Sequence, residues 1–241
     1  MTAPKRIAAL DIARGAAIFG MFFYHGAFDL AYFGLVDPGF PFNPPMRLYS
    51  HAVACAFLIV SGAALALAHR ARVSASATWR RMAMLGAACA AITAATYAFA
   101  PTEAIWFGIL HCLTAAALIG LALLRAPAPV GLVLGAALLL APAFAGHAIA
   151  WPQWLGLSGA EPDTLDWRPL APWGGVFILA LSAARTRGAQ AFFAWLAQWR
   201  PGDFATRTLA FCGRHSLAVY LIHQPVFFAA LLGFFALTGR L

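Results

Sequence analysis

The chain has few charged residues and almost no lysine. Only 10% of its 241 residues are charged, whereas 63% are hydrophobic. This composition excludes a disordered, collagen-like, disulfide-rich or ordinary soluble cytosolic protein. Lysine occurs once, at Lys5, against fifteen arginines. That bias, together with abundant alanine, glycine and proline, is typical of a GC-rich bacterial genome and favours a bacterial source.

Clustered cysteines and the common catalytic motifs are also missing. The four cysteines stand alone, at Cys55, Cys89, Cys112 and Cys212, with no CxxC pair and no zinc-type Cys/His spacing. We therefore expect no disulfide and no metal. A plain Ser-His-Asp triad and a Walker phosphate loop are absent from the sequence as well.

Long apolar runs dominate what is present. Several extend for about 18 residues, which is enough to cross the hydrocarbon core of a bilayer. They predict an all-α, polytopic membrane bundle of about seven transmembrane helices, forming one domain over residues 1–241. The runs cover residues 8–31, 50–69, 80–99, 105–124, 129–148, 170–184 and 207–237.

Charge divides the connecting segments into two groups. Positive residues gather on the cytoplasmic side of membrane proteins, so the pattern predicts an N-in, C-out, multi-pass protein of the bacterial inner membrane. Because the net charge of +8 lies in these connectors, nucleic-acid binding is disfavoured. The predicted cytoplasmic residues are Lys5, Arg6, Arg70, Arg72, Arg80, Arg81, Arg125, Arg185, Arg187, Arg200 and Arg207. The opposite side receives Asp37, Glu103, Glu161, Asp163 and Asp166, with Arg47, Arg168 and Arg240.

Two further segments have a predicted relation to the membrane. Asp11 and Arg14 interrupt the first apolar run, which argues against a cleaved signal peptide and for a retained first span. The segment GAQAFFAWLAQWR, residues 188–200, has aromatic residues among small and polar ones. It predicts an amphipathic helix on the cytoplasmic face.

Four ionisable residues lie in the first predicted span. On a helix, Asp11, Arg14, His25 and Asp29 fall at relative angles of about 0°, 300°, 320° and 0°. They therefore share one stripe. Because charged groups at membrane depth cost roughly 2.5–3.5 kcal/mol each, such a stripe faces a bundle interior or a wet cavity. The spacings allow Asp11 to pair with Arg14 and His25 with Asp29.

This stripe has two interpretations. The pairs can simply hold helices together, or they can form a functional site. Arg14 and His25 are about 16 Å apart along the helix. Arg14 could then hold the anionic end of an extended donor while His25 meets its reactive end. Asp29 would orient the imidazole and raise its basicity.

Other polar residues extend the candidate site. Arg214 and His215 form a positive pair suited to phosphate, and His223 precedes Pro225 in the last run, where a freed carbonyl can turn polar groups inward. His111 fits a buried interhelical hydrogen bond as well as a site role. On the outer side, Asp166, Arg168 and Trp173 could bind an acceptor or form an interfacial turn.

Several segments resemble one family of membrane enzymes. RIAALDIARGAAIFGMFFYH (6–25) is similar to the first helix of transmembrane acyltransferases, whose motif places a His eleven residues after an Arg or Lys. FGILHCLTAAALIG (107–120), LDWRPLAPWGGVFILAL (165–181) and CGRHSLAVYLIHQPVFF (212–228) look like the bacterial family related to the catalytic domain of heparan-α-glucosaminide N-acetyltransferase.

The resemblance implies acyl transfer, most simply acetyl transfer, from cytoplasmic acetyl-CoA or another acyl-CoA to a hydroxyl or amine of an acceptor at the outer face. It implies that Arg14 binds the donor and that His25 is the catalytic base. With these we group Asp29 and His223 as catalytic, and Asp11, His111, Arg214 and His215 as donor-binding. The acceptor is open, a glycan being one choice, as are a homo-oligomer and an acyl-histidine intermediate in place of direct transfer.

Two other classes remain open from the residues alone. Intramembrane His and Asp residues also form the proton relays of transporters and channels, although no inverted repeat is evident. Several transmembrane histidines could also ligate haem, although no CxxCH motif is present.

Overall fold

The protein is described by a computed structural model that covers residues 7–70, 74–145, 152–158 and 161–239. These residues form helices joined by loops, with no strand among them, which confirms the all-α prediction. Lys5, Arg6, Arg72 and Arg240, which entered the predicted topology, lie outside the described residues.

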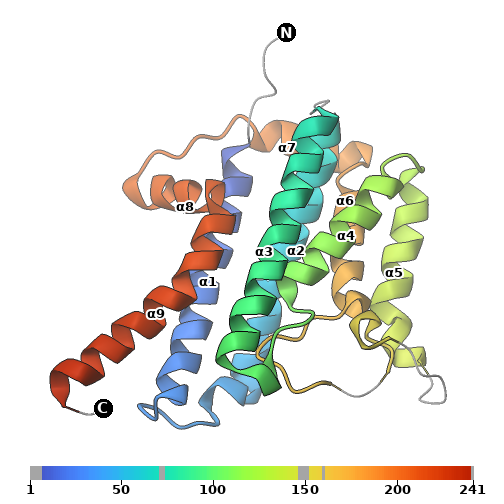
Figure 1. Cartoon of the computed structure of the whole chain (residues 1–241). Coiled ribbons are helices and arrows are strands. Elements are labelled where there is room, and N and C mark those ends of the chain that lie inside the picture. Colours follow the sequence, from blue (N-terminus) through green and yellow to red (C-terminus); the bar gives the residue numbers. More distant parts are fainter. Residues whose placement is uncertain (1–6, 71–73, 146–151, 159–160, 240–241) are drawn as a thin grey trace. The chain divides into compact units, whose positions relative to one another are not determined.

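The described helices belong to two compact units (Figure 1). Unit 1 covers Leu58–Trp195, and unit 2 covers Arg6–Phe57 with Leu196–Leu241. The α2 helix, Pro44–Arg70, contributes to both. The other elements of unit 1 are α3(Ala75–Phe99), η2(Pro101–Glu103), α4(Ile109–Leu123), α5(Ala128–Phe144), η3(Gln153–Leu155), η4(Leu170–Gly174), α6(Gly175–Ala183) and α7(Arg187–Leu196). Unit 2 also contains α1(Ala8–Tyr32), η1(Phe40–Phe42), α8(Phe204–Arg214) and α9(Ser216–Thr238).

Side-chain caps explain where several helices begin. Asn43 Oδ1 accepts the N–H of Met46 at 2.9 Å, and two prolines follow at the first helical positions, so α2 starts at Pro44 rather than near residue 50. Ser74 caps α3 through the N–H of Ala77. Asp203 caps α8 through the N–H of Thr206 at 2.9 Å.

The last apolar run is where the helices of the structure differ most from those predicted from the sequence. One helix was expected over residues 207–237, but the chain turns at His215 and forms two helices, α8 and α9. His215 has φ −102° and ψ 24°, outside the helical region. The α9 helix continues through Pro225.

The core of unit 1 surrounds α6. Phe177, Ile178 and Leu181 of this helix are almost fully buried, as are Leu58 of α2 and Cys112 of α4. Figure 1 shows α6 in the middle of this group of helices, with α4 and α5 beside it. Because α6 is apolar on all sides and enclosed, it is the central helix of the unit.

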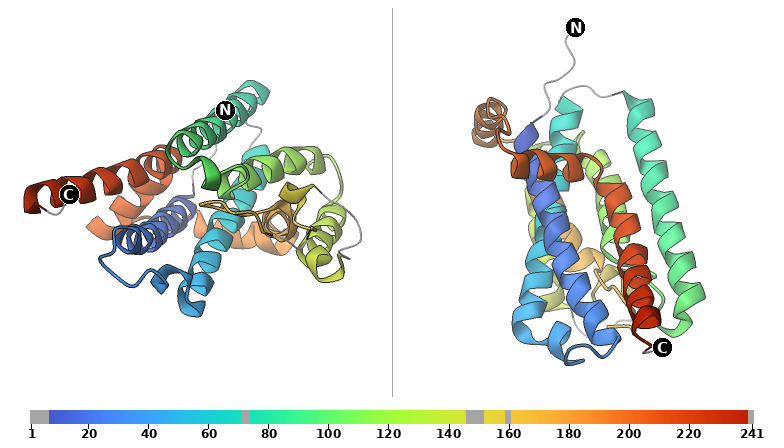
Figure 2. Two further views of the ribbon diagram at one scale, coloured as in Figure 1. Left: turned by 60° about the horizontal axis from the view of Figure 1, so that its bottom comes forward. Right: turned by 90° about the vertical axis from the view of Figure 1, so that its left-hand side faces the viewer.

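In unit 2, α8 crosses the N-terminal part of α1 at close range. A Cβ atom on Gly15 would overlap the carbonyl of Leu209, and one on Gly213 would overlap the carbonyl of Asp11. The two glycines therefore allow backbone-to-backbone contact. Figure 2 shows α8 lying across α1, with α9 running beside α1.

The α1 and α9 helices run in the same direction. Phe22 contacts Phe227 at a ring distance of 5.6 Å, and Phe33, further along α1, contacts Phe235, further along α9. This parallel register brings the middle of α1 against the polar segment before Pro225.

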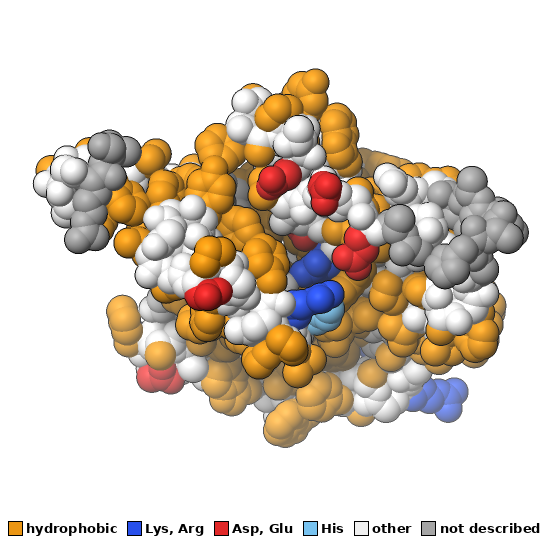
Figure 3. Space-filling model, turned by 90° about the horizontal axis from the view of Figure 1, so that it is seen from below, with side chains coloured by type: hydrophobic (Ala, Val, Ile, Leu, Met, Phe, Trp, Pro, Cys, Tyr) orange, Lys and Arg blue, Asp and Glu red, His pale blue; other side chains and the backbone are white. Residues whose placement is uncertain are grey.

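Three helices among the described residues are long and apolar enough to cross a bilayer: α2, α3 and α9. The α4 helix has 15 residues and measures about 22 Å, below the roughly 30 Å of a hydrocarbon core. Large apolar side chains are widely exposed, such as Phe144 at 83%, and the face in Figure 3 is mostly hydrophobic. The protein is a membrane protein, while seven spans and the N-in, C-out orientation remain predictions.

Candidate functional site

A buried carboxylate in α1 is held by an amide from α9. Asp29 is fully buried, and its Oδ1 accepts a hydrogen bond from Gln224 Nε2 at 2.5 Å. Because a carboxylate oxygen only accepts, this contact fixes the orientation of the Gln224 amide. Its Oε1 is then directed away from Asp29 as a second acceptor.

His223 has a defined tautomer. Its Nδ1 lies 2.6 Å from the carbonyl oxygen of Tyr220. Since a carbonyl only accepts, Nδ1 carries the hydrogen, and in the neutral ring Nε2 keeps an unshared electron pair. The side chain is 7% exposed. Nε2 is therefore a buried basic nitrogen.

His25 lies against His223. Their ring centroids are 5.0 Å apart, with the planes inclined at 67°. Phe22 stacks on the His223 ring at a centroid distance of 5.3 Å. His25 is half-buried, so it is the more accessible of the two imidazoles. The α1–α9 contact thus places two histidines side by side in unit 2.

Three buried atoms of this cluster have no hydrogen-bond partner among the described residues: Asp29 Oδ2, His223 Nε2 and Gln224 Oε1. All three are acceptors, given the ionised carboxylate and the orientations above. Buried acceptors without partners are costly and uncommon. A group that brings N–H or O–H donors is what complements them.

The predicted pair of Asp11 and Arg14 is present nearer the start of α1. Arg14 Nη1 lies 3.3 Å from Asp11 Oδ1 and donates to the carbonyl of Gly213 at 3.3 Å. The second contact exists because Gly15 and Gly213 let α8 approach α1. Asp11 is buried and Arg14 is partly buried, so the guanidinium is held in place.

Arg214 and His215 follow Gly213 at the junction of α8 and α9. Both are exposed and flank the ring of Phe211: the guanidinium carbon lies 5.9 Å from its centroid and the imidazole centroid 4.7 Å. Arg14 contacts the residue just before this pair. With Asp11, which pairs with Arg14, this end of unit 2 therefore gathers four of the predicted donor-binding residues.

His111 lies in unit 1, on α4. Thr93 Oγ1 donates to the carbonyl of Ile105 at 2.7 Å and lies 3.1 Å from His111 Nε2. Because the hydroxyl hydrogen is used on Ile105, Thr93 accepts from Nε2–H. His111 Nδ1 is buried without a partner among the described residues. An interhelical hydrogen bond, one of its two predicted uses, is thus present.

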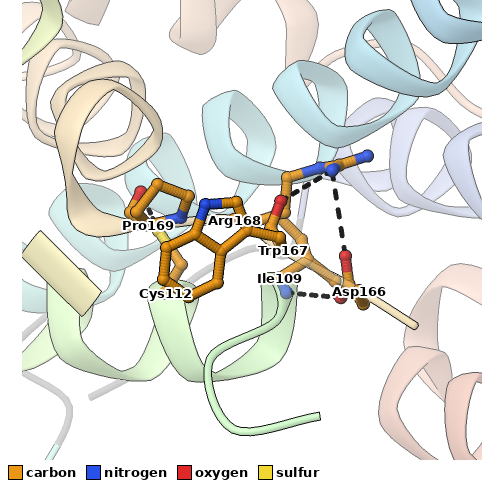
Figure 4. A network of polar contacts seen from close by, with 6 residues as sticks. All are labelled: Ile109, Cys112, Asp166, Trp167, Arg168 and Pro169. Atoms are coloured by element: carbon orange, nitrogen blue, oxygen red, sulfur yellow. Dashed lines mark hydrogen bonds and ion pairs between the residues drawn. The ribbon is translucent and has the colours of Figure 1, made fainter. Parts of the chain in front are cut away.

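The residues that the sequence predicted for the outer side form a polar network in unit 1 (Figure 4). Asp166 Oδ2 accepts the N–H of Ile109 at 2.7 Å and so caps α4. Arg168 lies 4.0 Å from Asp166 Oδ1 and its guanidinium lies 5.0 Å from the ring centroid of Trp173. Asp166 therefore has a structural role at the start of α4.

Unit 2 brings together most of the predicted site residues, in two groups. His25, Asp29 and His223 lie in the middle of α1 and α9, while Asp11, Arg14, Arg214 and His215 lie near their beginnings. The sequence prediction paired Asp29 with His25, and it turned Gln224 inward together with His223 without pairing it with Asp29. Only the position of Gln224 beside His223 and Pro225 hinted at its contact with Asp29.

One comparison with known proteins gives a result. The family model described as heparan-alpha-glucosaminide N-acetyltransferase, catalytic, matches residues 6–225. No curated protein and no solved structure matches the chain.

Proposed function

The chain belongs to the heparan-alpha-glucosaminide N-acetyltransferase catalytic family, and from this premise we propose that it transfers an acyl group from acyl-CoA to a hydroxyl or amine. The observation that carries the proposal is the set of three unpartnered buried acceptors on Asp29, His223 and Gln224. These atoms can accept hydrogen bonds from the N–H or O–H groups of the molecule that receives the acyl group. Two imidazoles lie beside them and can take up the proton that this molecule loses.

The donor would enter at the beginning of α1. Arg14, held by Asp11 and the Gly213 carbonyl, would supply guanidinium N–H donors in a fixed position for a CoA phosphate. Arg214 and His215 add exposed positive and polar groups next to it. The rise of about 16 Å between Arg14 and His25 would then bring the thioester of an extended donor near the histidines.

The chemical step moves one proton and exchanges one bond. The acceptor nitrogen or oxygen attacks the thioester carbonyl while His25 takes its proton, and the new C–N or C–O bond forms as the C–S bond breaks. The imidazolium then returns the proton to the CoA thiolate. His223 Nε2 is positioned to share the proton, and the charge of Asp29 stabilises the imidazolium.

Acetyl-CoA binding and turnover in nanodiscs test this proposal. We expect Arg14→Ala to weaken acetyl-CoA binding and His25→Asn to leave binding nearly unchanged. With glucosamine as the first acceptor probe, His25→Asn should slow release of the CoA thiol by about 10²–10⁴-fold. His51→Asn, an exposed histidine of α2, is the matched control and should keep full activity.

Two results would overturn the proposal. One is a folded wild type with no affinity for acetyl-CoA or for longer acyl-CoAs. The other is thiol release that survives in both His25→Asn and His223→Asn. Proton transport without acyl transfer would instead favour a transporter.

We place the enzyme in the bacterial inner membrane, with the donor on the cytoplasmic side.

A further inference from the structure

Unit 1 contains a cavity of about 390 Å³ that the acyl-transfer proposal does not use. It lies where the last turn of α2, the end of α4 and the end of α6 meet α7. Its polar lining consists of His69, Arg70, Arg185 and Gln190, and its other lining residues are apolar. The volume falls within the roughly 300–1,000 Å³ of small-ligand sites.

Arg185 is fixed in the wall of this cavity. Its guanidinium donates to the carbonyls of Leu123, Leu124 and Ala126 at 3.0, 3.3 and 2.6 Å. These are C-terminal carbonyls of α4 and of the turn after it, which attract positive charge. Three of its five N–H donors are used in these bonds, and two remain. Since carbonyls are neutral acceptors, the full positive charge also remains.

Arg70 supplies the second positive charge. It is exposed at the end of α2, next to His69, and makes no hydrogen bond or ion pair within the described part of the chain. None of the described residues that line the cavity is acidic. Two arginines and a histidine therefore line this small space, with no acidic residue among the described lining residues to balance their charge.

The α7 helix, which lines the cavity, has the features of a helix that lies at a membrane surface. Gln190 of α7 lines the cavity and donates to the Arg185 carbonyl at 2.9 Å. On the same helix, Phe192 and Trp195 are 52% and 64% exposed. Exposed aromatic residues on an amphipathic helix are typical of the membrane–water interface.

We propose that this cavity binds a phosphate monoester or diester. Guanidinium groups form paired, charge-assisted hydrogen bonds with phosphate, and the apolar wall suits the carbon chain attached to it. A phospholipid headgroup and a nucleotide both present this chemistry. The site is independent of the acyl-transfer proposal, because it requires no turnover and none of the residues around His25.

Native mass spectrometry of the purified full chain tests the site with two probes. One arm adds phosphatidylglycerol, with phosphatidylcholine as the zwitterionic reference lipid. The other adds guanosine 5′-monophosphate, a water-soluble nucleotide that is not part of CoA. We expect one probe to bind with an affinity that Arg70→Gln lowers about tenfold, as loss of a charged hydrogen bond predicts. The arm that shows this dependence identifies the source of the phosphate.

Arg80→Gln is the matched control, since it removes the same charge from an exposed residue of α3 that does not line the cavity. It should retain wild-type affinity. Equal losses in Arg70→Gln and Arg80→Gln would show nonspecific charge attraction and overturn the proposal. So would binding of neither probe above the phosphatidylcholine level. Unfolding temperatures of the variants check that each is folded.

Discussion

Gln224 of α9 donates a hydrogen bond of 2.5 Å from Nε2 to Oδ1 of Asp29 in α1, across 195 positions of sequence. This contact joins the two helices that carry the histidine cluster. It also leaves one oxygen on each side chain, Asp29 Oδ2 and Gln224 Oε1, without a partner among the described residues. The same bond therefore stabilises unit 2 and shapes its candidate site.

Replacing Gln224 by Leu should lower the free energy of unfolding by about 1–3 kcal/mol, because Asp29 then loses its donor while staying buried. Denaturant titration in detergent micelles measures the change. Gln198→Leu, at an exposed position after α7, should stay within about 0.5 kcal/mol of wild type. Equal stability of the two variants would contradict the role given to Gln224.

Gly15→Ala should destabilise the contact between α1 and α8 by about 1–3 kcal/mol, because the new methyl group overlaps the Leu209 carbonyl. It should also weaken acetyl-CoA binding, since Arg14 would lose the Gly213 carbonyl. Gly233→Ala on α9 is the control, because no atom lies within 4 Å of its added Cβ. That change should leave stability equal or raised by up to about 1 kcal/mol, as alanine favours a helix. An unaffected Gly15→Ala variant would refute the close packing.

The two histidines should act as one unit in turnover. Because their ring centroids are 5.0 Å apart, the losses in kcat caused by His25→Asn and His223→Asn should not add in the double variant. A double-mutant cycle on thiol release measures the coupling. Fully additive losses would mean that the histidines work separately.

The cap of α8 should make stability depend on pH in the acid range. Hydrogen bonds from the backbone and then the side chain of Thr206 lower the pKa of Asp203 below its usual 3.8. A lowered folded-state pKa contributes stability above the unfolded value, and this stability is lost as pH falls through the folded value.

The difference in unfolding temperature between wild type and Asp203→Ala should therefore be full near pH 6 and shrink below about pH 3.8. Asp203→Asn keeps a capping side chain without the charge, so it should differ from Asp203→Ala by an amount independent of pH. A difference between wild type and Asp203→Ala that stays constant down to pH 2 would contradict the assignment.

Local features of the chain were predictable because helical periodicity is local. The stripe of ionisable residues on α1 follows from the fixed rotation per residue of a helix. The burial of Asp11 and Asp29 and the pair between Asp11 and Arg14 could therefore be predicted from the sequence. The amphipathic helix expected within residues 188–200 is present as α7, for the same reason.

The break at His215 was not predictable in this way. Gly213, Arg214, His215 and Ser216 interrupt the apolar residues at this point, but polar residues also occur within a continuous span, as on α1, so the local pattern did not identify a turn. The turn follows from packing, because Gly213 must meet the backbone of α1 for α8 to lie across it.

By itself, the sequence determined the membrane class, the existence of the helices and the family, since these depend on composition, local period and motifs. Tertiary structure decided which groups meet: Gln224 with Asp29, His223 with His25, and Arg14 with the Gly213 carbonyl. Each of these contacts depends on how one helix packs against another. The register between separate helices is set by side-chain volume and close backbone approach, which a pattern along one helix does not contain.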